Sequence, residues 1–407
     1  MDGEPALVNR KRAIVWMIIL ILVTNLGTYA LATGQIPLVR DYIRPQLPGD
    51  MAQFDKLYQI MQLIKDKYVD KVDDNTLIEG AIAGMVESLK DPPSYYLNAD
   101  AMNELMIDTS GTYAGVGIQV WSKSDYIEVI APIEGTPAEK AGIITKDKII
   151  KVDGKDIVGV PIDSVVNLIR GEPGTKVTLT ILRDGVKEPF DVPIVRAQIE
   201  LKSVYSKMLP DKLGYIRITN FAENTTKPFT DALTALKGEG MVGLVLDLRN
   251  DPGGSLKTCE EIAAQLVPAG PILHVVDRDG RRQTYDVPGP GLKMPIVVLV
   301  NGGSASASEI LAGAIQDSGI GALVGEKTYG KGSVQTIYPL SGNTGVKITT
   351  YKYLTRNSRT VDKVGLTPDY VLAIPQPKEG EIPMKLDDPK NPQLIKAIEV
   401  LKALLKK

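Results

Sequence analysis

Two segments of the chain repeat one pattern, in which an apolar strand runs into a polar, glycine-rich turn and a helix follows. They read VGLVLDLRNDPGG at 242–254 and IVVLVNGGSASASEILAGAIQD at 296–317. Fully apolar strands are typical of a sheet that is covered on both faces. Strands that alternate with helices predict a layered α/β core, in which functional groups gather at the carboxyl ends of the strands. Both glycine turns lie at such an end.

The composition limits the classes of protein to consider. The 407 residues correspond to roughly two to four domains, and 43% of them are hydrophobic, which is ample for globular cores. Lysine and arginine number 47 against 49 aspartate and glutamate residues, so no basic surface argues for nucleic acid. Cys259 and His274 are the only residues of their types, which excludes an internal disulfide and gives no set of metal-ligand spacings. We expect neither a metal nor a cofactor.

The N-terminus predicts export. A basic cluster at 10–12 precedes Ala13–Thr33, an uncharged run of about the length that crosses a bilayer as a helix. The positively charged side stays in the cytoplasm. Ala30 and Ala32 form an A-x-A pattern that also suits a cleaved signal peptide, but the run is longer than a usual signal h-region, so we favour an anchor. Either reading exports the rest of the chain, and a cysteine-poor exported protein suits a bacterial cell envelope.

Helical spacing of apolar residues appears at both ends of the exported part. Residues 54–89 carry two such patterns, which indicate helices that pack on a neighbouring domain or self-associate. The tail NPQLIKAIEVLKALLKK has lysines opposite its apolar face and indicates a docking or dimer-forming helix rather than one on a membrane surface. We therefore divide the chain into a cytoplasmic stub with anchor, a linker with helices, a β-rich domain, a layered core and a helical tail, at 1–35, 36–103, 104–198, 199–375 and 376–407.

The β-rich domain consists of short strand-like runs and turns, with one amphipathic helix at 162–169. The ordered set GVGI, GTPAEKAGI, KIIKVDG and VVNLIRG resembles a PDZ domain. In that family a glycine loop turns backbone N–H groups toward a peptide's terminal carboxylate, and the next strand pairs with the peptide. For Val165, Val166 and Ile169 we favour a place in the peptide pocket, and an ordinary core position is the alternative. The resemblance implies a loop and pocket formed by Gly115, Val116, Gly117, Ile118, Val165, Val166 and Ile169.

Arg170 directly follows the helix of this domain. It is a fixed positive charge beside the expected pocket, where it can pair with a substrate carboxylate or with the layered core. An arginine at a helix end is also favoured by the helix dipole alone. A regulatory role and a solvated helix end therefore both remain open for Arg170.

The turn NGGSASASEILAG holds three alternating serines, and a nucleophile among them needs a proton acceptor. The one histidine, His274, lies in an apolar strand, which favours a structural role. A lysine serves instead if burial lowers its pKa from about 10.4 to roughly 7 or 8. Lys331 in TYGKGSVQT fits, because glycines flank it and strand alternation puts Lys331, Ser333 and Gln335 on one face. The rival Lys327 is followed by no such polar face.

GSASASE, GEKTYGKGSVQ, DLRNDPGG and the late GLTPD, with the helical leader and the PDZ-like domain, resemble bacterial carboxyl-terminal processing peptidases, also called tail-specific proteases. The resemblance covers nearly the whole chain. It implies a multidomain α+β protein whose layered core is crotonase/ClpP-like. It also implies that Ser306 is the nucleophile, that Lys331, 25 residues later, is its base, and that Gln335 is the third member of the site.

The same resemblance implies an oxyanion site at the backbone N–H groups of Ala307 and of Gly253 or Gly254, where a helix begins. The departures from the family are small. Pro93 stands where the family often has histidine, and Asp251 where it often has asparagine. Neither is a catalytic position in the family.

Together these features predict a membrane-anchored serine-type endopeptidase that faces the cell envelope. Neutral Lys331 takes the proton of Ser306, Ser306 attacks the scissile carbonyl, and water hydrolyses the acyl-enzyme. The expected partners are proteins with free C-terminal tails, the membrane and a second copy of the chain. One alternative is a non-catalytic PDZ scaffold on a peptidase-like fold, which need not keep all these residues together. Another is an acyl-CoA enzyme with a related core, which the PDZ-like domain and the export signal disfavour.

Overall fold

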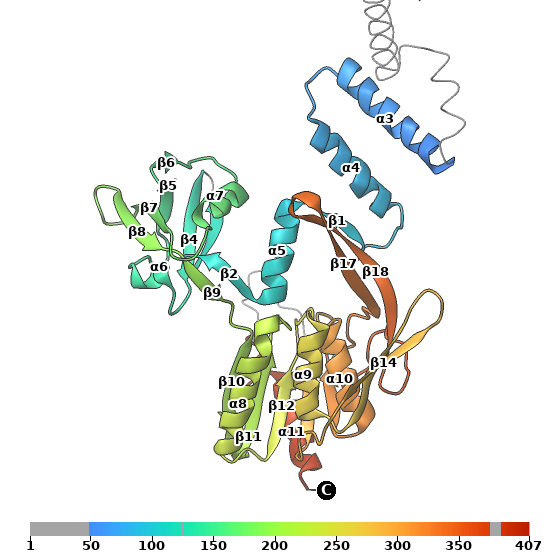
Figure 1. Cartoon of the computed structure of the whole chain (residues 1–407). Coiled ribbons are helices and arrows are strands. Elements are labelled where there is room, and N and C mark those ends of the chain that lie inside the picture. Colours follow the sequence, from blue (N-terminus) through green and yellow to red (C-terminus); the bar gives the residue numbers. More distant parts are fainter. Residues whose placement is uncertain (1–48, 124, 375–383, 407) are drawn as a thin grey trace, which may run out of the picture. The chain divides into compact units, whose positions relative to one another are not determined.

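The structure is a computed structural model that describes residues 49–123, 125–374 and 384–406 (Figure 1). The predicted anchor at 13–33 and most of the linker after it lie outside these residues. Within the described ranges, no helix is both long enough and apolar enough to cross a membrane. The internal contacts divide the chain into a first unit that ends at Met85 and a second unit, Val86–Lys407.

The first unit contains helix α3 (Gly49–Lys67) and most of helix α4 (Asp74–Glu87), which confirms the helical prediction for 54–89. An ion pair of 2.6 Å joins Lys65 of α3 to Asp74 of α4. Large apolar side chains of α3 remain exposed, so packing on another surface and self-association both stay predictions. These side chains are Phe54, Leu57, Tyr58, Ile60 and Leu63.

The second unit begins with strand β1 (Tyr95–Leu97) and helix α5 (Ala99–Ser110). The side chain of Asn98 caps α5 by accepting a hydrogen bond of 2.9 Å from the N–H of Ala101. The helix ends at Gly111, whose φ of 71° and close approach to Asn224 require a residue without a Cβ. The chain then enters β2 (Thr112–Gly115), which pairs antiparallel with β9 (Ala197–Glu200) at the exit of the next domain.

The domain between β2 and β9 is an antiparallel sheet of strand order β3-β4-β5-β7-β8, with β6 paired to β5. Alternate residues of β7, Val177, Leu179 and Ile181, are buried in its core, as the period of a strand requires. The predicted helix at 162–169 is confirmed as α7. The elements are β3 (Ile118–Lys123), β4 (Tyr126–Pro132), α6 (Pro137–Lys140), β5 (Lys148–Val152), β6 (Lys155–Asp156), α7 (Ile162–Ile169), β7 (Lys176–Leu182) and β8 (Phe190–Val195).

The layered core is built on a sheet of order β10-β11-β12-β15-β16-β19, parallel except for β10. All residues of β12 and β15 are buried, as their apolar sequences predict. Because Asp247 of β12 pairs with Leu299 of β15, the glycine turns that follow the two strands start at the same edge. The strands are β10 (Val204–Leu209), β11 (Leu213–Ile218), β12 (Gly243–Asp247), β15 (Ile296–Val300), β16 (Gly321–Gly325) and β19 (Tyr370–Val371).

Helices cover both faces of this sheet. One face is covered by α8 (Thr226–Gly238), α9 (Leu256–Leu266) and α10 (Ala307–Ser318) (Figure 1). Leu244 and Leu246 of β12 belong to the core between these helices and the sheet. Val245 points the other way and packs with α11 (Pro392–Leu404). The predicted C-terminal helix thus docks on its own sheet.

A second sheet has the order β1-β18-β13-β14, with β17 also paired to β18. At the base of the long hairpin of β17 and β18, Val334, Tyr351 and Tyr353 pack on the core of the layered domain. The strands of this second sheet, after β1, are β13 (Gly270–Val276), β14 (Arg282–Val287), β17 (Ser333–Leu340) and β18 (Thr344–Thr355), and short 3-10 turns lie at Pro210–Lys212, Glu223–Thr225 and Ser341–Asn343.

The docking of α11 yields a stability prediction. Leu401 is fully buried, and a Cβ at Gly243 would lie 3.1 Å from its Cδ1, so the contact is tight. We expect Leu401→Ala to lower the free energy of unfolding of the core by about 2–5 kcal/mol, measured by urea unfolding. Leu405→Ala, at an exposed position of the last turn, is the control and should stay within about 0.5 kcal/mol. Equal losses in the two variants would contradict this packing.

Candidate active site

One groove of the second unit collects the residues that the sequence singled out. It has a volume of about 520 Å³ and lies where the two glycine turns meet the start of β17, under residues of α5 and β18. His274 and Lys327 are not among its lining residues, and Lys327 is exposed. The predicted catalytic and oxyanion residues all line it: Ser306, Lys331, Gln335, Gly253, Gly254 and Ala307.

Ser306 stands at the start of α10 in a strained conformation. Its φ of 54° and ψ of −117° lie in a region that residues with a side chain rarely occupy, at a cost of about 1–3 kcal/mol. Two hydrogen bonds hold it there. Its N–H donates to Oε2 of Glu309 at 3.0 Å, and its carbonyl accepts from the N–H of Ile310 at 2.9 Å. The strand, the sharp turn and the helix thus present the Ser306 side chain to the groove.

The carboxylate of Glu309 joins the serine turn to the lysine loop. The side chain is fully buried. Besides the N–H of Ser306, it accepts the N–H groups of Gly330 at 2.8 Å and Lys331 at 2.9 Å and the hydroxyl of Thr328 at 2.5 Å. The main chains of Ser306 and Lys331 are therefore fixed to one rigid group. Glu309 was not predicted as a site residue, although its S-x-x-E spacing from Ser306 is a capping-box signal.

Lys331 is half-buried, and burial lowers the pKa of its amine, as the sequence analysis required of a base. The positive charge of Lys347 lowers this pKa further, and Glu309 opposes the shift. The flanking glycines allow the burial. A Cβ at Gly332 would lie 2.2 Å from the main-chain nitrogen of Asp362.

Lys347 is a second lysine of the groove that the sequence analysis missed. It lies on β18 opposite Ile337 of β17. Its Nζ is 3.4 Å from the hydroxyl of Tyr95 and 5.2 Å from the centre of that ring. Burial lowers the pKa of the Lys347 amine, and the carboxylate of Asp108 on α5 opposes this. Two partly buried amines thus face one cavity.

Gln335 lines the groove through a short network. Its amide nitrogen donates to Oγ of Ser333 at 2.9 Å and to Oγ1 of Thr349 at 3.2 Å. Thr349 in turn donates to the carboxylate of Asp91 at 2.6 Å. Both donors of the amide are therefore used, and its carbonyl oxygen is the acceptor that remains. Lys331 itself precedes β17, and a register shift follows Val334, but Lys331, Ser333 and Gln335 still line the same groove as predicted.

The glycine turn 251–254, which we call the oxyanion turn after its predicted role, packs tightly against the turn that carries Ser306. A Cβ at Gly253 would lie 2.8 Å from the backbone nitrogen of Ala307, so only glycine allows this approach. The N–H of Gly253 donates to Oδ1 of Asp251 at 2.8 Å and is therefore occupied. Within the described residues the backbone N–H groups of Gly254 and Ala307 have no acceptor. The geometry thus favours Gly254 over Gly253 as the partner of Ala307.

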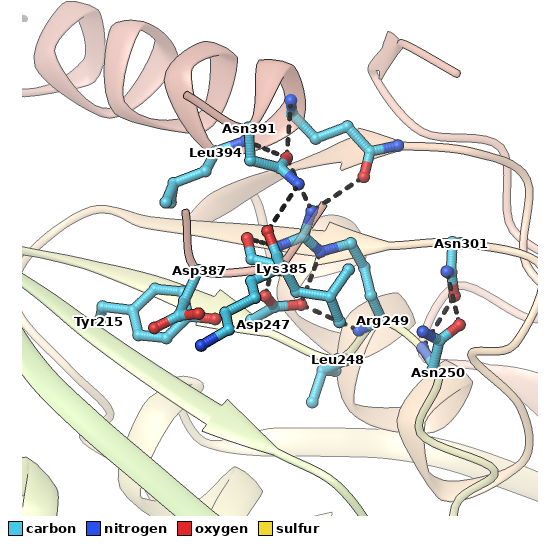
Figure 2. Close-up of polar contacts among 12 residues, drawn as sticks. Tyr215, Asp247, Leu248, Arg249, Asn250, Asn301, Lys385, Asp387, Asn391 and Leu394 are labelled. Atoms are coloured by element: carbon cyan, nitrogen blue, oxygen red, sulfur yellow. Dashed lines mark hydrogen bonds and ion pairs between the residues drawn. The ribbon is translucent and has the colours of Figure 1, made fainter. Parts of the chain in front are cut away.

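Side chains tie the two turns together behind the groove. The N–H of Asn250 donates to Oδ1 of Asn301 at 2.9 Å, and the amide of Asn301 donates back at 2.8 Å (Figure 2). Ser304 and Ser308 are both fully buried. The hydroxyl of Ser304 donates to the carbonyl of Leu248 at 2.7 Å, and that of Ser308 to the carbonyl of Asp251 at 3.0 Å. These two serines hold the turns and do not face the groove.

A buried ion pair anchors the oxyanion turn to the C-terminal helix. Arg249 is fully buried, and its guanidinium donates to the carboxylate of Asp247 at 2.9 Å and 2.5 Å. It also donates to Oδ1 of Asn391 and Oε1 of Gln393, at the start of α11 (Figure 2). The hydroxyl of Tyr215 completes the set by donating to Asp247 at 2.7 Å. This ion pair was not predicted, although Asp247 and Arg249 are opposite charges two residues apart in an apolar segment, which is a sequence signal for a buried pair.

His274 has a structural role, as predicted. It lies on β13 with 8% of its surface exposed. Its ring nitrogens are 2.8 Å from Oγ1 of Thr284 and 3.2 Å from the carbonyl oxygen of Arg356. Both ring nitrogens are thus engaged away from the groove.

The β-rich domain has a separate, smaller groove of about 160 Å³ between the glycine loop and α7. The carbonyls of Val116 and Gly117 accept hydrogen bonds from within the domain, at 2.9 Å each, whereas their N–H groups have no acceptor in the described chain. Val165 is fully buried in the core and does not line the groove. The other predicted residues do line it: Gly115, Val116, Gly117, Ile118, Val166, Ile169 and Arg170.

Arg170 follows α7, and its guanidinium lies 5.7 Å from the ring centre of Tyr113. Both residues line the small groove. The arrangement is a cation–π contact, which holds a positive charge at the rim of the groove.

Comparisons with known proteins agree with this geometry. Three family models match the chain: "Peptidase family S41" at 212–372, "PDZ domain" at 128–183 and "Activating protease CtpB N-terminal domain" at 40–101. The carboxy-terminal processing protease CtpA of Bacillus subtilis is 40% identical over 80% of this chain and 70% of its own length. The chain belongs to peptidase family S41. It is a serine-type peptidase with a PDZ domain, in a multidomain α+β fold.

Two further proteins are similar to most of this chain. A carboxy-terminal-processing protease of Bartonella bacilliformis is 40% identical over 80% of this chain and 76% of its own length. Among solved structures, a photosystem II D1 C-terminal processing protease is 31% identical, covers 78% of this chain and 92% of its own, and has a TM-score of 0.47. Family membership does not favour the non-catalytic scaffold.

The two amines of the groove give a prediction. Because the charge of Lys347 lowers the pKa of Lys331, we expect Lys347→Met to raise the pKa of the Lys331 amine. The titration of the Lys331 side chain by NMR measures it directly, and the ascending limb of kcat/KM against pH should move to higher pH with it. Lys352→Met, at an exposed lysine of the same strand, is the control and should leave the titration in place. An unchanged Lys331 titration in Lys347→Met would refute the coupling.

Proposed function

We propose that this peptidase cleaves proteins at their C-terminal tails, with Ser306 as nucleophile and neutral Lys331 as general base. One observation carries the proposal. A strained serine, a lysine whose pKa is lowered by burial, and two backbone N–H groups without an acceptor in the described chain line one groove.

The chemistry follows from these groups. The neutral amine of Lys331 takes the proton of the Ser306 hydroxyl, and the hydroxyl oxygen bonds to the scissile carbonyl carbon. The carbonyl oxygen becomes an anion, which the N–H groups of Gly254 and Ala307 stabilise. The Lys331 ammonium then gives its proton to the leaving amine, and the C–N bond breaks. Lys331 next takes a proton from a water, whose oxygen attacks the acyl carbon. The ester C–O bond then breaks, the Lys331 ammonium returns its proton to the Ser306 oxygen, and the free acid leaves.

Gln335 is proposed as a positioning residue for Lys331. Its amide nitrogen is held by Ser333 and Thr349, so its oxygen is left to accept from the amine. An uncharged acceptor orients the amine without stabilising the ammonium as a carboxylate would. The lysine therefore keeps its lowered pKa.

The PDZ domain is proposed to capture the free C-terminal carboxylate of a substrate through the N–H groups of the loop Gly115–Ile118. The carbonyls of Val116 and Gly117 accept hydrogen bonds from within the domain, so the N–H groups of the loop remain available to a ligand. We further propose that capture opens a gate, with Arg170 coupling the groove to the peptidase, since a constantly active exported protease would endanger its neighbours. A tether without gating is the simpler alternative.

We also propose a cellular location and an oligomeric state for the protein. The uncharged run Ala13–Thr33 after a basic cluster supports a single-pass anchor with the peptidase outside the cytoplasm of a bacterium, or secretion after signal cleavage. The exposed apolar side chains of α3 support a homodimer.

The catalytic pair is tested by substitution. We expect Ser306→Ala and Lys331→Ala each to lower turnover of an unstructured protein substrate by roughly 10⁴-fold or more, and the double variant to be little worse, because the two groups act as a unit. The measurement is cleavage by purified, folded variants. His274→Ala is the control and should keep its activity and its pH profile. An active Lys331→Ala enzyme would exclude lysine as the base.

Carboxylate capture is tested with matched peptides. We expect a tail peptide with a free carboxylate to bind tightly and to activate cleavage, and its C-terminal amide to do neither, since the amide lacks the charge that the loop N–H groups recognise. Calorimetry and cleavage assays measure the two effects. Arg170→Gln should weaken activation more than it weakens folding. Equal binding and cleavage of acid and amide would rule out both capture and gate.

A further inference from the structure

The oxyanion turn contains a carboxyl group that the mechanism does not use. Asp251 is fully buried. Its Oδ1 accepts the N–H of Gly253 at 2.8 Å, and its backbone carbonyl accepts the N–H of Ala305 at 3.0 Å and the hydroxyl of Ser308. Its Oδ2 is buried and has no hydrogen-bond partner among the residues that the structure describes. One oxygen thus shapes the turn, and the other has no donor that would stabilise a negative charge.

The groups around Asp251 provide little compensation for such a charge. Arg217 of β11 is the cation that faces it, but no ion pair joins the two within the described residues, and the Nε of Arg217 is itself buried without a partner. Cys259 of α9 is the other titratable neighbour, and burial raises the pKa of its thiol, so it stays neutral. From α10 the hydroxyl of Ser308 lies near the carboxyl and opposes the rise of its pKa, but the hydroxyl donates to the backbone carbonyl of Asp251 and not to the free carboxyl oxygen.

We propose that Asp251 is a positioning residue of the oxyanion turn that supports catalysis in its neutral form and opposes it when ionised. The inference rests on the proposed function. A neutral carboxyl still accepts the N–H of Gly253 through its carbonyl oxygen, so the turn keeps its shape. An ionised carboxyl places a negative charge beside Gly254 and Ala307, where the substrate oxygen must become negative.

The carboxyl of Asp251 changes its charge near neutral pH, where the peptidase is expected to work. Burial raises the pKa of Asp251 to about 7, although the N–H of Gly253, the hydroxyl of Ser308 and the charge of Arg217 oppose the shift. Lys331 must lose a proton to act, whereas Asp251 must keep one. Activity therefore rises with pH as Lys331 loses its proton and is reduced as Asp251 loses its own.

Asp251→Asn separates the two effects, because asparagine keeps the acceptor for Gly253 and cannot ionise. We expect the ratio of kcat/KM of Asp251→Asn to that of the natural enzyme to rise roughly ten-fold between pH 6 and pH 9, with the ascending limb of Lys331 retained. Asp251→Ala lacks the acceptor, so its kcat should be lower than that of Asp251→Asn at every pH. Asp279→Asn, at an exposed aspartate of the β13–β14 turn, is the control, and its ratio should be constant.

Thermal unfolding supplies a readout that needs no activity. The carboxyl ionises in the unfolded chain near its ordinary pKa but in the folded chain only near 7, so folding loses stability as pH rises between these values. The Tm of Asp251→Asn relative to the natural protein should therefore increase from pH 4 to pH 7 and stay constant above. The same difference for Asp279→Asn should not change with pH.

The outcomes are distinguishable. Cleavage that depends on Ser306, with a constant ratio between Asp251→Asn and the natural enzyme, would overturn this inference and leave the proposed function intact. A Tm difference that does not change with pH would overturn it as well. Cleavage that does not depend on Ser306 would contradict the proposed function itself, and the catalytic role of Asp251 with it.

Discussion

The buried carboxylate of Glu309 is the contact on which the rest of the site depends. It accepts four hydrogen bonds, from the N–H groups of Ser306, Gly330 and Lys331 and from the hydroxyl of Thr328. A carboxylate removed from water requires such donors, so the two segments cannot separate without leaving a buried charge unpaired. The strained backbone of Ser306 persists because this cost exceeds the strain. The serine and the lysine are thus held by their main chains, and their side chains need no hydrogen bond to each other to stay in place.

The oxyanion turn is held from the opposite side of the sheet. Arg249, two residues before Asp251, donates to Asp247 and to Asn391 and Gln393 at the start of α11. Because α11 packs on the face that α8–α10 leave open, a segment close to the C-terminus supports the glycine turn that lines the groove. A buried pair of this kind contributes little net stability but strongly penalises a broken arrangement. Its effect is therefore to select one geometry for the turn.

The sequence was most informative where chemistry is local. Ser306, Lys331 and the glycine turns follow buried strands, so their meeting at one edge could be predicted from parallel pairing alone. Lys347 could not, because a register shift after Val334 decides which hairpin residues face the groove. Val165 was predicted to line the PDZ pocket, yet it is core, since the rotation of α7 against its sheet is a tertiary property. The capping-box spacing between Ser306 and Glu309 is visible in the sequence. The contacts of Glu309 with residues 328–331 are not, because they depend on how two distant segments pack together.

The three buried carboxyl groups near the groove receive different amounts of compensation, and this difference determines how the site can respond to pH. Asp247 has the guanidinium of Arg249, and Glu309 has four donors, so both charges are compensated by hydrogen bonds. Asp251 has one backbone donor to its side chain and an unpartnered oxygen. None of the three forms an ion pair with Lys331 within the described residues. Burial lowers the pKa of Lys331, and the least compensated carboxyl, Asp251, whose pKa burial raises to about 7, lies in the same turn as Gly254.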